Sequence, residues 1–202
     1  MGASHNVPVP TAPPSDDTDE TLMLRYARGD LGAFDQLYGR HELAVWRFVF
    51  RSVKVQAVAD DLLQDVWFAV ARNAGTYEVK ARFRTWLFTL AHHRLVDHLR
   101  TAKNHTSLDA SDDDARSLAD TLVADSGFGP VRQWQSREQA AALIAAVERL
   151  PLEQREAFLL QAEGDLSVQE IAEATGVNFE TAKSRLRYAR ASLRVQLKEF
   201  AP

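Results

Sequence analysis

The chain of 202 residues contains no cysteine, which excludes disulfide bonds, thiolate zinc sites and cysteine nucleophiles. It lacks an apolar run near the ~20 residues of a membrane-spanning helix, so we expect no membrane insertion. No basic start followed by an apolar core opens the chain, so we expect no secretory signal. These absences favour a cytoplasmic protein, and 46% hydrophobic with 26% charged residues is ordinary for a folded one.

Motifs of catalysis are also lacking. No serine lies in a G-x-S-x-G elbow, and there is no glycine-rich phosphate loop. A metal site at His92, His93, Asp97 and His98 is an alternative, but adjacent histidines on a helix point about 100° apart and no third ligand is evident. We therefore expect that the chain is not an enzyme and that it binds no metal, cofactor or small-molecule substrate.

Helical periodicity dominates what is present. Apolar residues recur at spacings of three and four from Glu20 to Arg100 and again from about Gln133, and no alternating strand pattern of useful length occurs. Gly29-Asp30 and the stretch 73–76 are typical helix breaks. We predict an all-α protein with a disordered tail (1–20), a helical domain (21–103), a linker (104–132) and a second helical domain (133–202).

The linker is expected to be flexible and acidic, because its composition shifts to Asp, Ser and Gly. Its carboxylates are Asp109, Asp112, Asp113, Asp114, Asp120 and Asp125.

A helix-turn-helix is predicted in the second domain. Ser167 and Glu170 have the spacing of a capping box, Gly176 suits the turn, and Asn178 can cap the next helix. Residues 181–198 hold six basic residues and no acid, while Ala182 and Leu186 recur on the inward side. A basic helix of this kind enters the DNA major groove. The alternative is a solvated basic face on an ordinary helical hairpin.

Two sequence blocks carry a family resemblance. The run LPLEQREAFLLQAEGDLSVQEIAEATGVNFETAKSRLRYARASL resembles the fourth domain of bacterial sigma factors of the extracytoplasmic-function group. The runs DDLLQDVWFAVARN and FRTWLFTLAHHRLVDHLR resemble their second domain. The resemblance implies a subunit that binds core RNA polymerase, directs it to promoter DNA and is held inactive by an anti-sigma factor. It implies also that the acidic linker threads towards the polymerase active centre, the alternative being a solvated spacer.

Three surfaces follow from the resemblance. The polymerase-binding face would consist of Asp61, Gln64, Asp65 and Phe68, which fall at i, i+3, i+4 and i+7 of one helix; a solvated acidic stripe is the alternative. The minus-ten DNA-binding surface would consist of Arg82, Phe83, Arg84, His92, His93, Arg94 and Arg100. The minus-thirty-five DNA-binding surface would consist of Thr181, Lys183, Ser184, Arg185, Arg187, Tyr188 and Arg190.

The chain departs from the family wording at two points. His92-His93 stands where Arg-Asn is commoner, and Arg187-Tyr188 where Ser-Arg or Phe-Arg is usual, so the preferred bases stay open. A different class remains as the alternative function: a stand-alone helix-turn-helix regulator whose amino-terminal helices sense a ligand or dimerise. The acidic face distinguishes the two functions, because only a sigma factor needs this face to bind polymerase.

Overall fold

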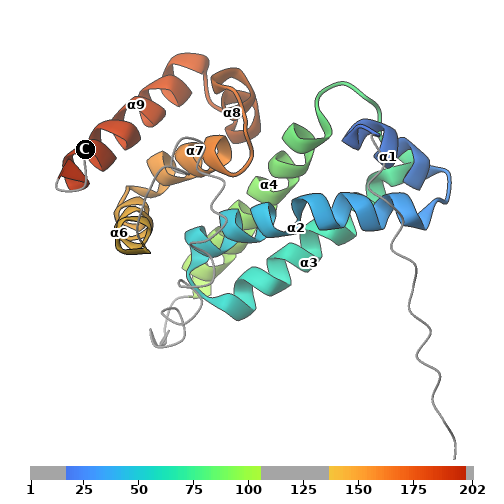
Figure 1. The fold of residues 1–202 in the computed structure, drawn as a ribbon, viewed down its shortest axis with the longest axis horizontal. Helices are drawn as coiled ribbons and strands as arrows, with labels where there is room; N and C mark the ends of the chain where they lie inside the picture. The colour runs from blue at the N-terminus through green and yellow to red at the C-terminus, as the bar shows by residue number, and fades with distance from the viewer. Residues whose placement is uncertain (1–16, 106–136, 199–202) are drawn as a thin grey trace, which may run out of the picture.

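The computed structural model describes residues 17–105 and 137–198, which are helical and contain no strand (Figure 1). The amino-terminal unit comprises α1 (Asp19–Ala27), α2 (Leu31–Val53), α3 (Gln56–Asn73), the short 3-10 helix η1 (Ala74–Thr76) and α4 (Phe83–His105). The carboxy-terminal unit comprises α6 (Arg137–Glu148), α7 (Leu152–Ala162), α8 (Val168–Thr175) and α9 (Phe179–Gln196). The all-α prediction is confirmed. None of the helices in these two ranges is long and apolar enough to cross a membrane.

Local signals set the helix ends of the first unit. Gly29, with φ of 98°, separates α1 from α2, and the Asp30 side chain caps α2 by accepting a hydrogen bond from the Ala33 N–H. The helix α3 ends at Asn73, where η1 begins. Both breaks lie where the sequence predicts them.

The boundary of the predicted tail needs correction. Residues 17–20 belong to the folded unit, because Thr18 caps α1 and Asp19 and Glu20 form its first turn, where acidic groups complement the helix dipole. Asp19 also accepts a hydrogen bond from Arg40 and lies 2.6 Å from His41 Nε2. Residues 1–16 of the predicted tail and the acidic residues of the predicted linker lie outside the described ranges.

The second unit contains the predicted helix-turn-helix, α8 and α9. Ser167 and Glu170 form the capping box in full, each side chain accepting from the backbone N–H of the other. Gly176 ends α8 with φ of 66°, and the Asn178 side chain caps α9. The inward residues Ala182, Leu186 and Ala189 are all buried. The local geometry therefore agrees with the sequence analysis at each of these positions.

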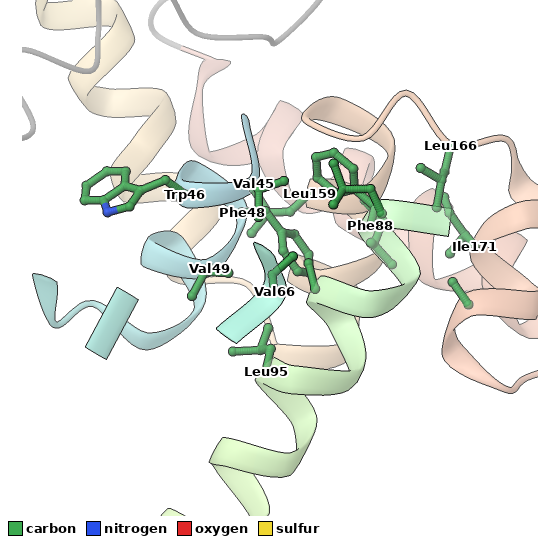
Figure 2. Close-up of a cluster of buried hydrophobic side chains, with 14 of the residues drawn as sticks. Val45, Trp46, Phe48, Val49, Val66, Phe88, Leu95, Leu159, Leu166 and Ile171 are labelled. Atoms are coloured by element: carbon green, nitrogen blue, oxygen red, sulfur yellow. The ribbon is translucent and has the colours of Figure 1, made fainter. Parts of the chain in front are cut away.

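The two units pack against each other, which the sequence did not predict. α4 packs on α8 and α2 packs on α7 (Figure 1). One cluster of buried side chains runs through both units: Phe48 and Val45 of α2 lie near Leu159 of α7, and Phe88 of α4 lies near Leu166 (Figure 2). Each large apolar side chain buried in this way contributes about 1.5–3 kcal/mol. The units thus share a continuous apolar core.

Candidate functional site

A groove on α2 and α3 contains most of the predicted acidic face. Asp61, Gln64 and Phe68 line this space of about 640 Å³, and Asp65 is exposed on the same helix. Phe68 is 57% exposed although it is a large apolar residue. The ring is therefore accessible to a partner, and burying it against that partner would be favourable because it removes apolar surface from water.

Aromatic rings form the wall of the groove. The ring centroids of Phe34 and Trp67 are 5.6 Å apart, and those of Tyr38 and Trp67 are 5.0 Å apart. Trp67 is buried, so its ring packs in the core beside the groove. Asp60, a further lining residue that the sequence analysis missed, accepts a hydrogen bond of 2.6 Å from Trp46 Nε1. The groove combines a rigid apolar wall with acidic side chains, a combination that suits a helix bearing apolar and basic residues.

The predicted minus-ten residues of α4 do not form one exposed surface. Phe83 is fully buried and its ring lies in the core, 5.5 Å from His41 between ring centroids, so its side chain is not accessible to DNA here. His92 is only 6% exposed, whereas His93 is exposed. Burial, aided by the positive charges of His93 and Arg185, lowers the pKa of His92 to about 4, so this imidazole is neutral at pH 7.

Arg82 and Arg84 of the predicted surface contact the second unit. Arg82 donates to the Asp165 carbonyl oxygen at 2.7 Å and to Glu170 Oε2 at 3.1 Å. Arg84 donates to the carbonyl oxygen of Glu163 at 2.5 Å. Further along the helix, Arg100 pairs with Asp97 on an exposed face and Arg94 is half-buried.

A second hollow lies where η1 and the following loop meet α4. Its volume is about 380 Å³, and Tyr77 and Trp86 contact each other in its wall with ring centroids 5.1 Å apart. Burial and the negative charges of Glu20 and Asp19 raise the pKa of Tyr77 to about 12, so its hydroxyl stays protonated. The full lining is Asn73, Thr76, Tyr77, Glu78, Lys80, Ala81, Trp86 and Leu90. This hollow could not be predicted from the sequence, where its only local signal is an aromatic and basic loop between two helices.

The exposed face of α9 presents the predicted minus-thirty-five residues. Lys183, Arg187, Tyr188 and Arg190 are exposed, while Thr181, Ser184 and Arg185 are half-buried. The Arg187 guanidinium lies 4.9 Å from the centre of the Tyr188 ring, so the two side chains stack. Arg185 pairs with Glu153 at 2.9 Å. Five of the seven lie in the amino-terminal half of α9, which in a DNA-recognition helix is the half that contacts base edges.

The metal alternative gains no support from the geometry. Among residues 17–105 and 137–198, no three His, Cys, Asp or Glu side chains come together in a way that could hold a metal ion.

Two protein families match the chain in succession. Sigma-70 region 2 matches residues 37–105, which run from α2 to the end of α4. Sigma-70 region 4 matches residues 140–193, which contain the helix-turn-helix.

Similar proteins agree with these matches. The sigma factor SigM of Mycobacterium tuberculosis (strain ATCC 25618 / H37Rv), an ECF RNA polymerase sigma factor, is 32% identical over 87% of this chain and 83% of its own length. CarQ of Myxococcus xanthus, an RNA polymerase sigma factor, is 32% identical over 88% of this chain and 97% of its own.

Solved structures share the fold. CnrH in complex with the cytosolic domain of CnrY has a TM-score of 0.63 and 23% identity, over 92% of this chain and 100% of that one. The sigma factor RpoE of Bartonella quintana with the anti-sigma factor NepR has a TM-score of 0.62 and 23% identity, over 82% and 96%. From the two matched regions and the relatives that span both, the chain belongs to the sigma-70 family, as an RNA polymerase sigma factor of the extracytoplasmic-function (ECF) group.

Proposed function

We propose that the chain binds core RNA polymerase through the groove of α2 and α3 and directs it to promoters. A sigma factor is a transcription-initiation factor and not an enzyme. The observation that carries the proposal is the groove itself, where Asp61, Gln64 and the exposed ring of Phe68 lie beside an aromatic wall. An acidic and apolar groove is complementary to a helical partner with basic and apolar side chains.

For the minus-ten element, the hollow beside η1 is the better place for an unstacked base than the site of His92. Removing a base from its stack costs a few kcal/mol, which stacking on an aromatic ring and hydrogen bonds can offset. Trp86 and Tyr77 offer rings, and the side-chain amide of Asn73 offers a donor and an acceptor. Lys80, His93 and Arg100 then lie on exposed positions from which they can contact phosphates.

For the minus-thirty-five element, α9 enters the major groove with Lys183 and Arg187 outward. An Arg can bind a guanine through two hydrogen bonds, which is worth about 1–3 kcal/mol in discrimination. Thr181, at the first turn of α9, is placed to contact a phosphate.

The chain works in the cytoplasm under this proposal, because core RNA polymerase and promoter DNA are there. The proposal includes an anti-sigma factor that holds the chain inactive. Support comes from RpoE of Bartonella quintana, whose structure was solved with the anti-sigma factor NepR.

Co-elution of the purified chain with bacterial core RNA polymerase on a sizing column tests the groove. We expect the wild-type chain to elute with polymerase, and the double variant Asp61→Arg with Asp65→Arg to elute alone, because like charges would then face a basic partner. The matched control is Asp35→Arg, an exposed acid of α2 that does not line the groove, and this variant is expected to co-elute. Unchanged binding of the folded double variant would show that polymerase binds elsewhere.

A further inference from the structure

The contact between the two units is built around a buried ion pair. Arg51 of α2 and Glu163, the residue that ends α7, are 2.6 Å apart, and their side chains are 2% and 0% exposed. Burying two charges is costly, and removing one partner of such a pair is strongly destabilising because the remaining buried charge has lost its nearest opposite charge. The pair therefore holds one particular arrangement of the two units.

The next residue allows the backbones to come close. A Cβ at Gly164 would lie 2.7 Å from Leu166 Cδ1, 2.5 Å from the Leu160 carbonyl oxygen and 3.0 Å from Phe88 Cδ1 of α4. Only a residue without a side chain fits the turn between α7 and α8 against α4. The close packing extends the ion pair into a continuous interface.

The same turn and the start of α8 occupy Arg82, a residue of the minus-ten surface that the resemblance implies and the neighbour of Ala81 in the lining of the proposed base-binding hollow. Glu170 accepts hydrogen bonds from Arg82 and from the Thr85 hydroxyl, the latter at 2.5 Å, and Asp165 pairs with Arg82 at 3.2 Å. Although partial burial opposes it, hydrogen bonds from Thr85, Ser167 and Arg82 lower the pKa of Glu170 to about 2, so this carboxylate is negative at pH 7. A negative oxygen that binds Arg82 stands where a DNA phosphate would.

Promoter geometry does not fit this packing. By their names the minus-ten and minus-thirty-five elements lie about 25 base pairs apart, or roughly 85 Å along B-DNA. Contact with both elements at once therefore requires the two DNA-binding surfaces to lie about that far apart. The 31 residues of 106–136 could span at most ~100 Å, which is enough to let the units separate.

We propose that the packed arrangement is a self-inhibited state, in which the α7–α8 turn and the first turn of α8, both in region 4, cover Arg82, Arg84 and Thr85 of region 2 as a substitute for DNA. Arg51 and Glu163 are the latch of this state. The groove for polymerase stays open, since Phe68 remains exposed, so polymerase can bind before the units separate. The inference rests on the proposed function, because the covered residues Arg82 and Thr85 adjoin Ala81 and Trp86 of the proposed base-binding hollow.

Distance measurements between two spin labels test the closed state. The natural chain has no cysteine, so Val55→Cys, just after α2, and Ala145→Cys of α6 place one label on each unit of the full chain. Both positions are exposed and lie near the contact of 3.4 Å between Lys54 and Glu148, which joins the two units. We expect one short distance in the free chain. A broad population of longer distances in the free, folded chain would overturn the proposal.

Variants of the latch make the test specific. Glu163→Gln is expected to move at least half of the molecules to longer distances, and the exchange Arg51→Glu with Glu163→Arg to restore the short one. Thr85→Val, which keeps the side-chain volume and removes the bond to Glu170, gives a milder shift. Glu138→Gln, at an exposed position of α6, is the matched control and should leave the distance between the labels unchanged. If the folded Glu163→Gln and Thr85→Val variants kept the short distance between the labels, the role of these contacts in holding the closed state would be wrong.

Co-elution with core polymerase separates this inference from the proposed function. We expect Glu163→Gln to bind polymerase as the wild-type chain does, because the ion pair does not line the groove. If the wild-type and Glu163→Gln chains both bind polymerase and the variant shows the same label distances as wild type, self-inhibition is overturned and the proposed function stands. Loss of binding by the wild-type chain would count against the proposed function instead.

Discussion

Glu20 of α1 accepts a hydrogen bond of 2.6 Å from the backbone N–H of Phe83, the first residue of α4. The first N–H groups of a helix have no partner within it, so Glu20 supplies one from another helix. This bond fixes the start of α4, three residues before Trp86 in the wall of the proposed base-binding hollow.

Loss of this contact should lower stability. Glu20→Ala is expected to reduce the free energy of unfolding by about 1 kcal/mol, the usual effect of losing a helix cap. Glu20→Gln keeps an accepting oxygen and should lose less. Urea denaturation followed by circular dichroism measures both, with Asp35→Ala on the surface of α2 as control. Equal stability of Glu20→Ala and wild type would mean that water replaces the carboxylate.

Gly164 should tolerate no side chain. Gly164→Ala is expected to cost about 1–3 kcal/mol, as overpacking does, because the new Cβ meets the Leu160 carbonyl oxygen and Leu166. Gly39→Ala, within α2 and with no atom within 4 Å of the new Cβ, is the matched control. It should instead stabilise by about 0.5–1 kcal/mol, since alanine favours a helix. Thermal unfolding distinguishes the two, and equal midpoints would contradict the close packing.

Stability should depend on pH through two buried groups of opposite effect. Burial, partly offset by the positive charges of Arg185 and Arg155, raises the pKa of Glu156 from 4.5 to about 7. The native state therefore binds more protons than the unfolded state between these values, and this contribution to stability falls as pH rises from 4.5 to 7. His92, with its pKa lowered from 6.5 to about 4, makes stability rise over the range from 4 to 6.5.

Glu156→Gln should separate these contributions. At pH 8 the variant is expected to be more stable than wild type by up to about 3 kcal/mol, because no buried carboxylate needs to ionise. Between pH 6.5 and 4 it should lose stability more steeply, since the contribution of His92 is no longer opposed. Urea denaturation at several pH values measures this, with Glu138→Gln, at an exposed position of α6, as control. Parallel pH curves for wild type and Glu156→Gln would contradict the burial of this carboxyl.

The helix α9 should contribute to promoter binding and not to the affinity for core polymerase. Arg187→Ala is expected to weaken binding of the polymerase holoenzyme to its promoter by about 1–3 kcal/mol, if the guanidinium reads a base. Lys183→Ala should act on a phosphate, with a slope of log affinity against log salt smaller by about 1. Filter binding at several salt concentrations measures both, with exposed Arg72→Ala of α3 as control. If holoenzymes with either variant bound promoter DNA as tightly as wild type, α9 would not be part of the DNA interface.

Local features of the fold could be predicted from the sequence. Ser167 with Glu170, Gly176 and Asn178 act on neighbours within four positions, so their spacing alone carries the information. The groove residues Asp61, Gln64 and Phe68 could be grouped because helical periodicity puts them on one face.

Long-range features could not be predicted. Arg51 and Glu163 are separated by 112 positions, and nothing local to either residue indicates a buried partner. Phe83 follows a basic residue in a segment that otherwise suits DNA, but its burial depends on His41, Tyr77 and Trp86 from other parts of the fold. The assignment of residues 17–20 to the tail failed similarly, because Arg40 and His41 provide the partners of Asp19.

The most direct measurement of the central claim is transcription by bacterial core RNA polymerase from sheared genomic DNA, with and without the purified chain. Mapping of transcript 5′ ends shows where initiation begins. We expect discrete new start sites that require the chain and disappear with Asp61→Arg and Asp65→Arg. The same transcripts with and without a folded, inhibitor-free chain would contradict its role as a sigma factor.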